Sequence, residues 1–182
     1  MSKKAIGIFV GSLRKESFSR KVALLLAEML SGKFETRLIE LGELAMYNQD
    51  LDDNAPPAWT AFRESVKAAD AFLFVTPEYN RTIPAVLKNA LDIGSRPYGQ
   101  SAWSGKPGGV VSVSPSKMGG FGSNHNLRQA VVFLNIFMMQ QPEAYVGGAA
   151  DIFGADGKIK DDGTRGFLQA YADAFAAWIE GF

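Results

Sequence analysis

Residues 5–20 read AIGIFVGSLRKESFSR, which is an apolar run, a glycine and serine turn, and the polar start of a helix. The run Ala5–Val10 contains no polar side chain, as is typical of a strand that is buried on both faces of a sheet. Gly11 closes the run, and the segment Ser17–Leu30 then has apolar residues at helical spacing. A buried strand that turns directly into a helix predicts a parallel sheet with helices packed on it.

The same alternation continues along the chain. The predicted strands are Ala5–Val10, Thr36–Leu41, Ala71–Val75, Gly109–Val113 and Glu143–Val146. The predicted helices are Ser17–Leu30, Pro57–Ala69, Pro84–Ile93, Asn124–Phe137 and Thr164–Ile179. This pattern predicts an α/β three-layer sandwich around a five-stranded parallel sheet, and 182 residues favour the shorter common strand order, 2-1-3-4-5. We expect one domain spanning residues 1–182.

Composition excludes several classes of protein. The chain has no cysteine and one histidine, which argues against a disulfide scaffold, thiolate metal sites and a cysteine nucleophile, so redox chemistry needs a bound organic cofactor. Nineteen basic and nineteen acidic residues give a net charge of zero, without the attraction that nucleic acids or anionic membranes require. The apolar run Ala130–Met139 is too short to span a bilayer. We therefore expect a cytoplasmic protein without nucleic-acid binding or membrane insertion.

Ligands of such sheets bind beyond the carboxyl ends of the strands, where the strand order reverses. The loops to consider are therefore Gly11–Ser17, Thr76–Ile83 and Ser114–Ser123. The first loop combines the hydroxyls of Ser12, Ser17 and Ser19 with Arg14 and Arg20, directly before a helix. Free N–H groups at a helix start attract an anion, so the loop predicts a site for one terminal phosphate. Alternatively, Ser17 only caps the helix and the cations form a solvated surface.

The second and third loops predict the remaining walls of a cleft. Pro77 and Pro84 stiffen the second loop, where Tyr79 and Asn80 could contact a planar heterocycle. In the third loop, Ser114, Ser116 and Gly119 allow a close approach of the backbone to a ligand. The alternatives are an ordinary strand-to-helix connection and a surface loop. We predict no metal site, because Asp50, Asp52 and Asp53 are typical of a solvated loop.

The segments GSLRKESFSRKVA and TPEYNRTIPAVLKNALD, with the later glycine-containing loop, resemble the NAD(P)H-dependent FMN reductase family, in its bacterial quinone and chromate reductase branch. The resemblance covers residues 4–148 and implies a flavodoxin-like fold with bound FMN. It implies that Ser12, Arg14, Ser17, Phe18, Ser19 and Arg20 hold the phosphate, that Pro77, Glu78, Tyr79 and Asn80 support the ring, and that Ser114, Ser116 and Gly119 close the far side. It also implies a homodimer or homotetramer, with Arg81, Arg96, His125 and Glu143 at the substrate mouth or the subunit interface.

Function has to be argued from the site, because this fold also serves electron carriers and signalling receivers. Receivers require acidic residues where this chain has Val10, Gly11 and Ser12, and carriers are typically strongly acidic. We expect an enzyme in which FMN accepts electrons from NADPH or NADH and passes them to a quinone or a similar acceptor, with no obligatory acid or base among the side chains. Two alternatives stay open: a flavin reductase that releases reduced FMN to a partner monooxygenase, and a non-enzymatic flavin electron carrier or redox sensor.

Overall fold

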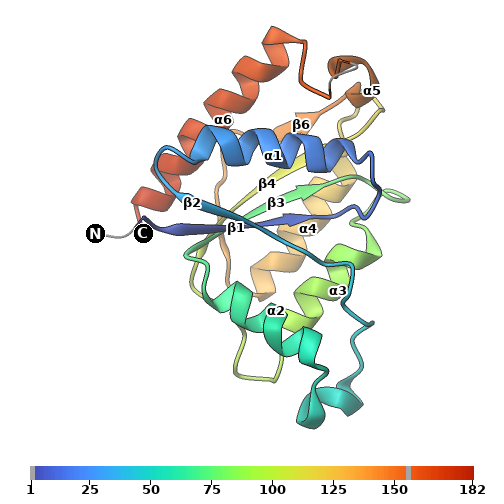
Figure 1. Cartoon of the computed structure of the whole chain (residues 1–182), viewed down its shortest axis with the longest axis vertical. Coiled ribbons are helices and arrows are strands. Elements are labelled where there is room, and N and C mark those ends of the chain that lie inside the picture. The colour runs from blue at the N-terminus through green and yellow to red at the C-terminus, as the bar shows by residue number, and fades with distance from the viewer. Residues whose placement is uncertain (1–2, 155–156) are drawn as a thin grey trace.

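A computed structural model describes residues 3–154 and 157–182 and places a parallel sheet between two helical layers (Figure 1). The strands follow the order β2-β1-β3-β4-β5, and β6 also pairs with β4. This result confirms the predicted α/β class and the order 2-1-3-4-5. The strands are β1 (Ala5–Val10), β2 (Glu35–Ile39), β3 (Ala71–Thr76), β4 (Pro107–Val113), β5 (Phe137–Met138) and β6 (Ala144–Val146).

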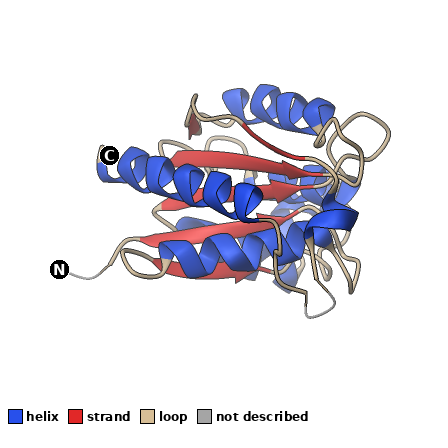
Figure 2. Cartoon of the chain, turned by 90° about the horizontal axis from the view of Figure 1, so that it is seen from above, coloured by secondary structure: helices blue, strands red, loops and turns tan. Residues whose placement is uncertain are grey.

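Helices cover both faces of the sheet (Figure 2). The helices are α1 (Phe18–Leu30), α2 (Pro57–Lys67), α3 (Ala85–Gly94), α4 (Phe121–Phe133), α5 (Ala149–Ile152) and α6 (Asp162–Glu180), with a 3-10 helix at Gln49–Asn54. Strand side chains alternate between the faces: Leu73 packs with α1 and α6, whereas Phe72 and Phe74 pack with α2, α3 and α4. Both faces of the central strands are therefore buried in hydrophobic core.

The fifth position of the sheet differs from the prediction, because two short strands share it. β5 pairs with the start of β4 and β6 with its end. Pro142, which has no N–H group, lies in the interruption. From α4, Arg128 donates to the carbonyl oxygen of Met139 (2.9 Å) and Asn124 to that of Ala144 (3.2 Å). Side chains of one helix thus satisfy carbonyl groups on both sides of the interruption.

The helix predicted over Asn124–Phe137 is wrong at both ends. α4 begins at Phe121 and ends at Phe133, and Phe137 belongs to β5. Asn135 has a left-handed backbone (φ 56°), a conformation that stops a helix. The 3-10 helix, α5 and β5 were not predicted, because segments of two to six residues are too short to show a period. In the described part of the chain, no helix is long and apolar enough to cross a membrane.

Candidate functional site

A pocket of about 200 Å³ lies at the carboxyl ends of β1, β3 and β4. Its lining comes from the three loops that the sequence predicted to meet there and from the ends of the adjoining elements. The lining residues are Ser12, Arg14, Ser17, Phe18 and Ser19 after β1, Pro77, Glu78 and Tyr79 after β3, and Val113, Ser114 and Pro115 at the end of β4. Gly11 keeps the first two loops close, because a Cβ atom there would lie 3.0 Å from Thr76 Oγ1 and 3.2 Å from Pro77 Cδ.

Serine hydroxyls and the start of α1 form one end of this pocket. Ser12, Ser17 and Ser19 are all buried. Ser17 is the N-cap of α1, and its hydroxyl accepts a hydrogen bond from the Arg20 amide (3.1 Å). In the first turn, the amides of Phe18 and Ser19 and the Ser19 hydroxyl have no partner within the described residues. The capping role and the phosphate-site prediction are therefore compatible, because free donors remain beside the cap.

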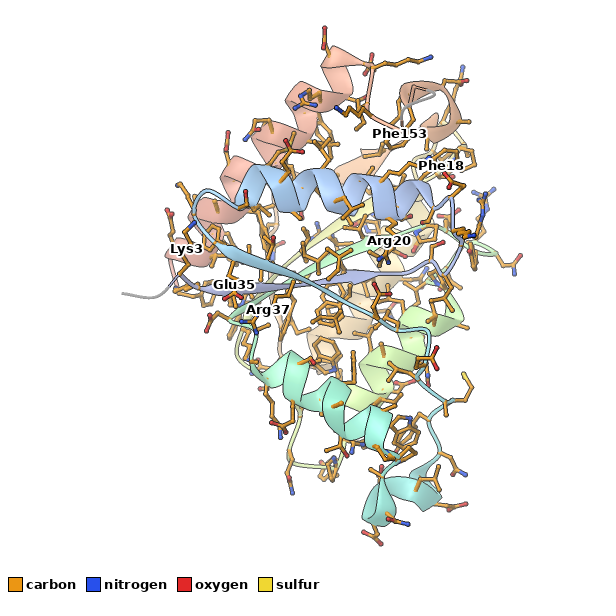
Figure 3. All side chains as sticks on the ribbon, in the orientation of Figure 1. Lys3, Phe18, Arg20, Glu35, Arg37 and Phe153 are labelled. Carbon is orange, nitrogen blue, oxygen red and sulfur yellow. The ribbon has the colours of Figure 1, made fainter. Side chains whose placement is uncertain are left out.

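Arg14 and Arg20 lie in different surroundings. Arg14 lines the pocket, and its exposed side chain makes no ion pair or hydrogen bond with any described residue. Arg20, labelled in Figure 3, instead pairs with Glu40 directly after β2 (2.8 Å), and that hydrogen bond raises the pKa of Arg20. The structure thus brings Arg14, and not Arg20, to the pocket.

The loop after β3 is a tight turn. The amide of Tyr79 donates to the carbonyl oxygen of Thr82, and the reverse bond is also present, both at 3.1 Å. The two residues between them, Asn80 and Arg81, have left-handed backbones (φ 50° and 67°), as in a type I′ turn. Asparagine tolerates this conformation, whereas arginine adopts it at a cost of about 1–3 kcal/mol. The family resemblance implied that Asn80 supports the FMN ring, but Asn80 does not line the pocket.

Glu78 lines the pocket, but its carboxylate serves another purpose. Oε2 accepts a hydrogen bond from the Ser123 amide (3.1 Å) in the first turn of α4. The N-cap residue of α4, Gly120, has no side chain to do this. A carboxylate is favourable at a helix start, where the dipole is positive. Glu78 therefore ties the turn to α4, and its main chain remains the part available to a ligand.

The third loop contributes less than predicted. Ser114 lines the pocket, but Ser116 and Gly119 do not. Gly119 has φ 61° and faces β6, where a Cβ atom would lie 2.8 Å from the Tyr145 backbone. Val113 and Pro115 also line the pocket and were not predicted, because an apolar strand end and a loop proline carry no distinctive signal.

The four predicted mouth or interface residues lie outside the pocket, at three places. Arg81 Nη1 is 3.8 Å from Glu78 Oε1 at the turn. Arg96, beyond the far end of α3, donates from Nε to the Tyr47 hydroxyl (3.2 Å). His125 Nε2 lies 2.9 Å from the Tyr145 hydroxyl and 4.0 Å from Glu143 Oε1. His125 and Glu143 thus belong to one cluster around Tyr145.

Burial, together with a hydrogen bond to Glu143 and the negative charge of Glu143, raises the pKa of Tyr145 to about 12, although the positive charge of Arg128 acts in the opposite direction. We expect Glu143→Gln to lower this pKa while leaving it above its usual value of about 10, because burial remains. The ultraviolet absorbance of tyrosinate, followed against pH, measures the change. The variant Tyr145→Phe identifies the signal, and an unchanged titration in Glu143→Gln would contradict the assigned interaction.

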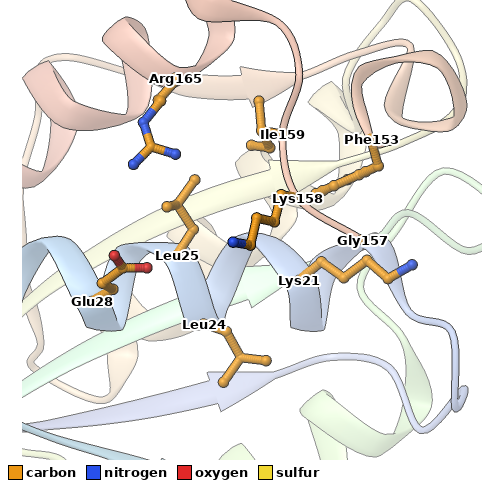
Figure 4. Close-up of a pocket in the computed structure, with 9 residues that line it drawn as sticks. All are labelled: Lys21, Leu24, Leu25, Glu28, Phe153, Gly157, Lys158, Ile159 and Arg165. Carbon is orange, nitrogen blue, oxygen red and sulfur yellow. The ribbon is translucent and has the colours of Figure 1, made fainter. Parts of the chain in front are cut away.

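A second pocket of about 260 Å³ lies along the outer side of α1 (Figure 4). Leu24, Leu25 and Ile159 line it together with charged side chains. It is linked to the first pocket through Phe18, whose ring stacks on Phe153 at 5.7 Å (Figure 3). Because α/β sheets bind ligands beyond their strand ends, the first pocket is the candidate site. Among the described residues, no group of three or more acidic or histidine side chains could hold a metal ion.

The strand order defines a flavodoxin-like protein, and its candidate pocket lies at the strand ends, where such folds bind ligands. The family NADPH-dependent FMN reductase matches residues 5–151, and the chain belongs to this family. A quinone reductase of Pseudomonas putida is 56% identical, with 97% of this chain and 95% of that protein covered. A 2-hydroxy-1,4-benzoquinone reductase of Burkholderia is 41% identical, with 96% and 95% covered.

Solved structures agree with this assignment. A flavoenzyme NAD(P)H:(acceptor) oxidoreductase from Paracoccus denitrificans superimposes with a TM-score of 0.92 at 39% identity, and 98% of each chain is covered. A flavodoxin from Pseudomonas aeruginosa superimposes with a TM-score of 0.60 at 18% identity, which shows the shared fold. The predicted family resemblance is thereby confirmed.

Proposed function

We propose that this protein is an FMN-dependent NAD(P)H oxidoreductase that transfers two electrons to quinones. The observation that carries the proposal is the pocket at the strand ends, where buried serine hydroxyls adjoin helix-start amides and an Arg14 side chain that have no partner among the described residues. Family membership and the quinone reductase relatives support the same activity.

The residues of the pocket fit FMN. Ser12, Ser17, Ser19 and the first-turn amides of α1 are donors for a monophosphate, and Arg14 supplies a positive charge. Pro77, Glu78 and Tyr79 would hold the ring through main-chain groups and an aromatic face. When bound, FMN supplies the redox chemistry, taking a hydride from NAD(P)H and passing two electrons to the acceptor.

The protein's own contribution is binding and orientation. The tight turn at residues 79–82 fixes the wall of the pocket, and Glu78 anchors this turn to α4. The described residues that line the pocket include no histidine or lysine and one carboxylate, that of Glu78, which is engaged with α4. We therefore assign no catalytic acid or base to this chain and regard the chemistry as flavin-mediated.

The visible absorption spectrum tests the proposal. We expect protein reconstituted with FMN to be yellow and to bleach when NADPH or NADH is added without oxygen, and to regain its colour when a benzoquinone follows. A bound flavin that ignores both nicotinamides would instead indicate an electron carrier or sensor. FMN that leaves on a desalting column only after reduction would indicate a flavin reductase.

Arg20→Ala is expected to change the dissociation constant of FMN by less than about threefold. The Arg20 side chain pairs with Glu40 and does not line the pocket, so its removal takes away no contact to the bound phosphate. Flavin fluorescence quenching during titration of the apoprotein measures the constant. If Arg20→Ala weakened FMN binding as much as the removal of the Arg14 side chain, Arg20 would contact the phosphate, as the family resemblance implied.

We further propose that residues 1–182 form a single domain and that the protein is a homodimer or homotetramer. We also propose that it lies in the cytoplasm and that its reduced flavin can pass electrons to chromate as an additional acceptor. Several large apolar side chains, including Phe133 at 84% and Val132 at 75% exposure, support self-association. Sedimentation velocity tests the oligomeric state, and chromate reduction with NADPH tests the acceptor.

A further inference from the structure

Two buried hydroxyls lie directly behind the pocket wall. Thr76, the last residue of β3, and Ser123, in the first turn of α4, are both completely buried. Thr76 Oγ1 donates to the carbonyl oxygen of Pro77 (2.8 Å) and lies 3.1 Å from Ser123 Oγ. Because a hydroxyl has one proton and that of Thr76 is used, Ser123 must be the donor in the second bond. The chain of donors therefore runs from Ser123 through Thr76 to Pro77.

This chain of hydrogen bonds fixes the Pro77–Glu78 peptide. In a trans peptide, the carbonyl group and the following N–H group point in opposite directions. The carbonyl oxygen of Pro77 is held inward by Thr76, so the N–H group of Glu78 points away from the core. That N–H group has no acceptor within the described residues, and Glu78 lines the pocket. The geometry thus presents a free donor at the pocket wall.

Resting on the proposed function, we propose that Ser123 and Thr76 are positioning residues, which lock the Pro77–Glu78 peptide so that its N–H group donates to an oxygen of the bound flavin ring. A fixed donor strengthens as negative charge develops on its acceptor. The locked peptide therefore favours the reduced cofactor over the oxidised one. Ser123 is thus bonded twice to the loop after β3, through its hydroxyl to Thr76 and through its amide to Glu78.

The test compares Thr76→Val and Ser123→Ala with Thr76→Ser, which keeps the hydroxyl. Ser65→Ala is the matched control, because Ser65 donates only to the carbonyl oxygen of Ala61 on the exposed side of α2. The midpoint potential of bound FMN and the dissociation constant of oxidised FMN are measured for each protein. The two values together give the affinity for the reduced cofactor.

We expect Thr76→Val and Ser123→Ala to lower the affinity for reduced FMN, relative to oxidised FMN, by about three- to tenfold, the worth of one hydrogen bond. This is a fall in potential of about 15–30 mV for a two-electron couple. Thr76→Ser and Ser65→Ala should retain the wild-type potential. The proposal would be overturned if Thr76→Val and Ser123→Ala had an unchanged or higher midpoint potential, or if they lost the same affinity for oxidised and reduced FMN. Wild-type protein that binds no FMN would instead overturn the proposed function itself.

Discussion

Arg14→Ala is expected to weaken FMN binding about tenfold while leaving the apoprotein fold intact. The Arg14 side chain lines the pocket, is exposed and has no partner in the described structure, so folding does not depend on it. A guanidinium bound to phosphate contributes about 1.5–3 kcal/mol when shielded, and exposure reduces this towards the lower limit, which corresponds to about tenfold. Titration of the apoprotein with FMN measures the effect.

Lys15→Ala is the matched control for Arg14→Ala. Lys15 is an exposed cation in the same loop, but it does not line the pocket. Both variants remove one positive charge, so a contribution from long-range attraction alone would weaken both equally. We expect Lys15→Ala to bind FMN within about twofold of the wild type, and the difference between the variants to shrink at high salt. Equal losses in both variants would remove Arg14 from the phosphate site.

The fold was largely predictable because its signal repeats along the chain. β1, β3 and β4 are almost entirely apolar, since the sheet is covered on both faces, and their positions were predicted within two residues. The edge of the sheet was less predictable. β5 has two residues and pairs only with the start of β4, so its existence depends on contacts between distant segments. No local pattern of side chains encodes such a strand.

The site was predictable at the level of loops and less so at the level of side chains. Ser17 and Arg14 both line the pocket as predicted. Arg20 has the same residue type as Arg14 and a similar place in the motif, yet it faces Glu40 on the neighbouring part of the chain after β2. Likewise, Glu78 carries a charge that suggests ligand binding, but it caps α4. Only the tertiary partner of each side chain decides between these roles.

Gly122→Ala is expected to lower turnover with NADPH and a benzoquinone about 100-fold, although alanine stabilises a helix more than glycine does. A Cβ atom at this position in α4 would lie 2.5 Å from the carbonyl oxygen of Arg81 and 2.9 Å from Glu78 Oε2. Ordinary contact begins near 3.4 Å, so the turn or the helix must retreat by about 0.9 Å. Displacements of about 1 Å in a positioning element can reduce rates by about 10²-fold.

Gly166→Ala separates this steric effect from the intrinsic effect of the substitution. Gly166 is an exposed residue in α6, and a Cβ atom there meets nothing within 4 Å. This variant should gain up to about 1 kcal/mol of unfolding free energy and keep wild-type turnover. Because Arg81 already has a strained left-handed backbone, the turn cannot move away from α4 without altering the wall at Glu78 and Tyr79. Wild-type turnover in Gly122→Ala would therefore show that the contact between α4 and the turn does not position the cofactor.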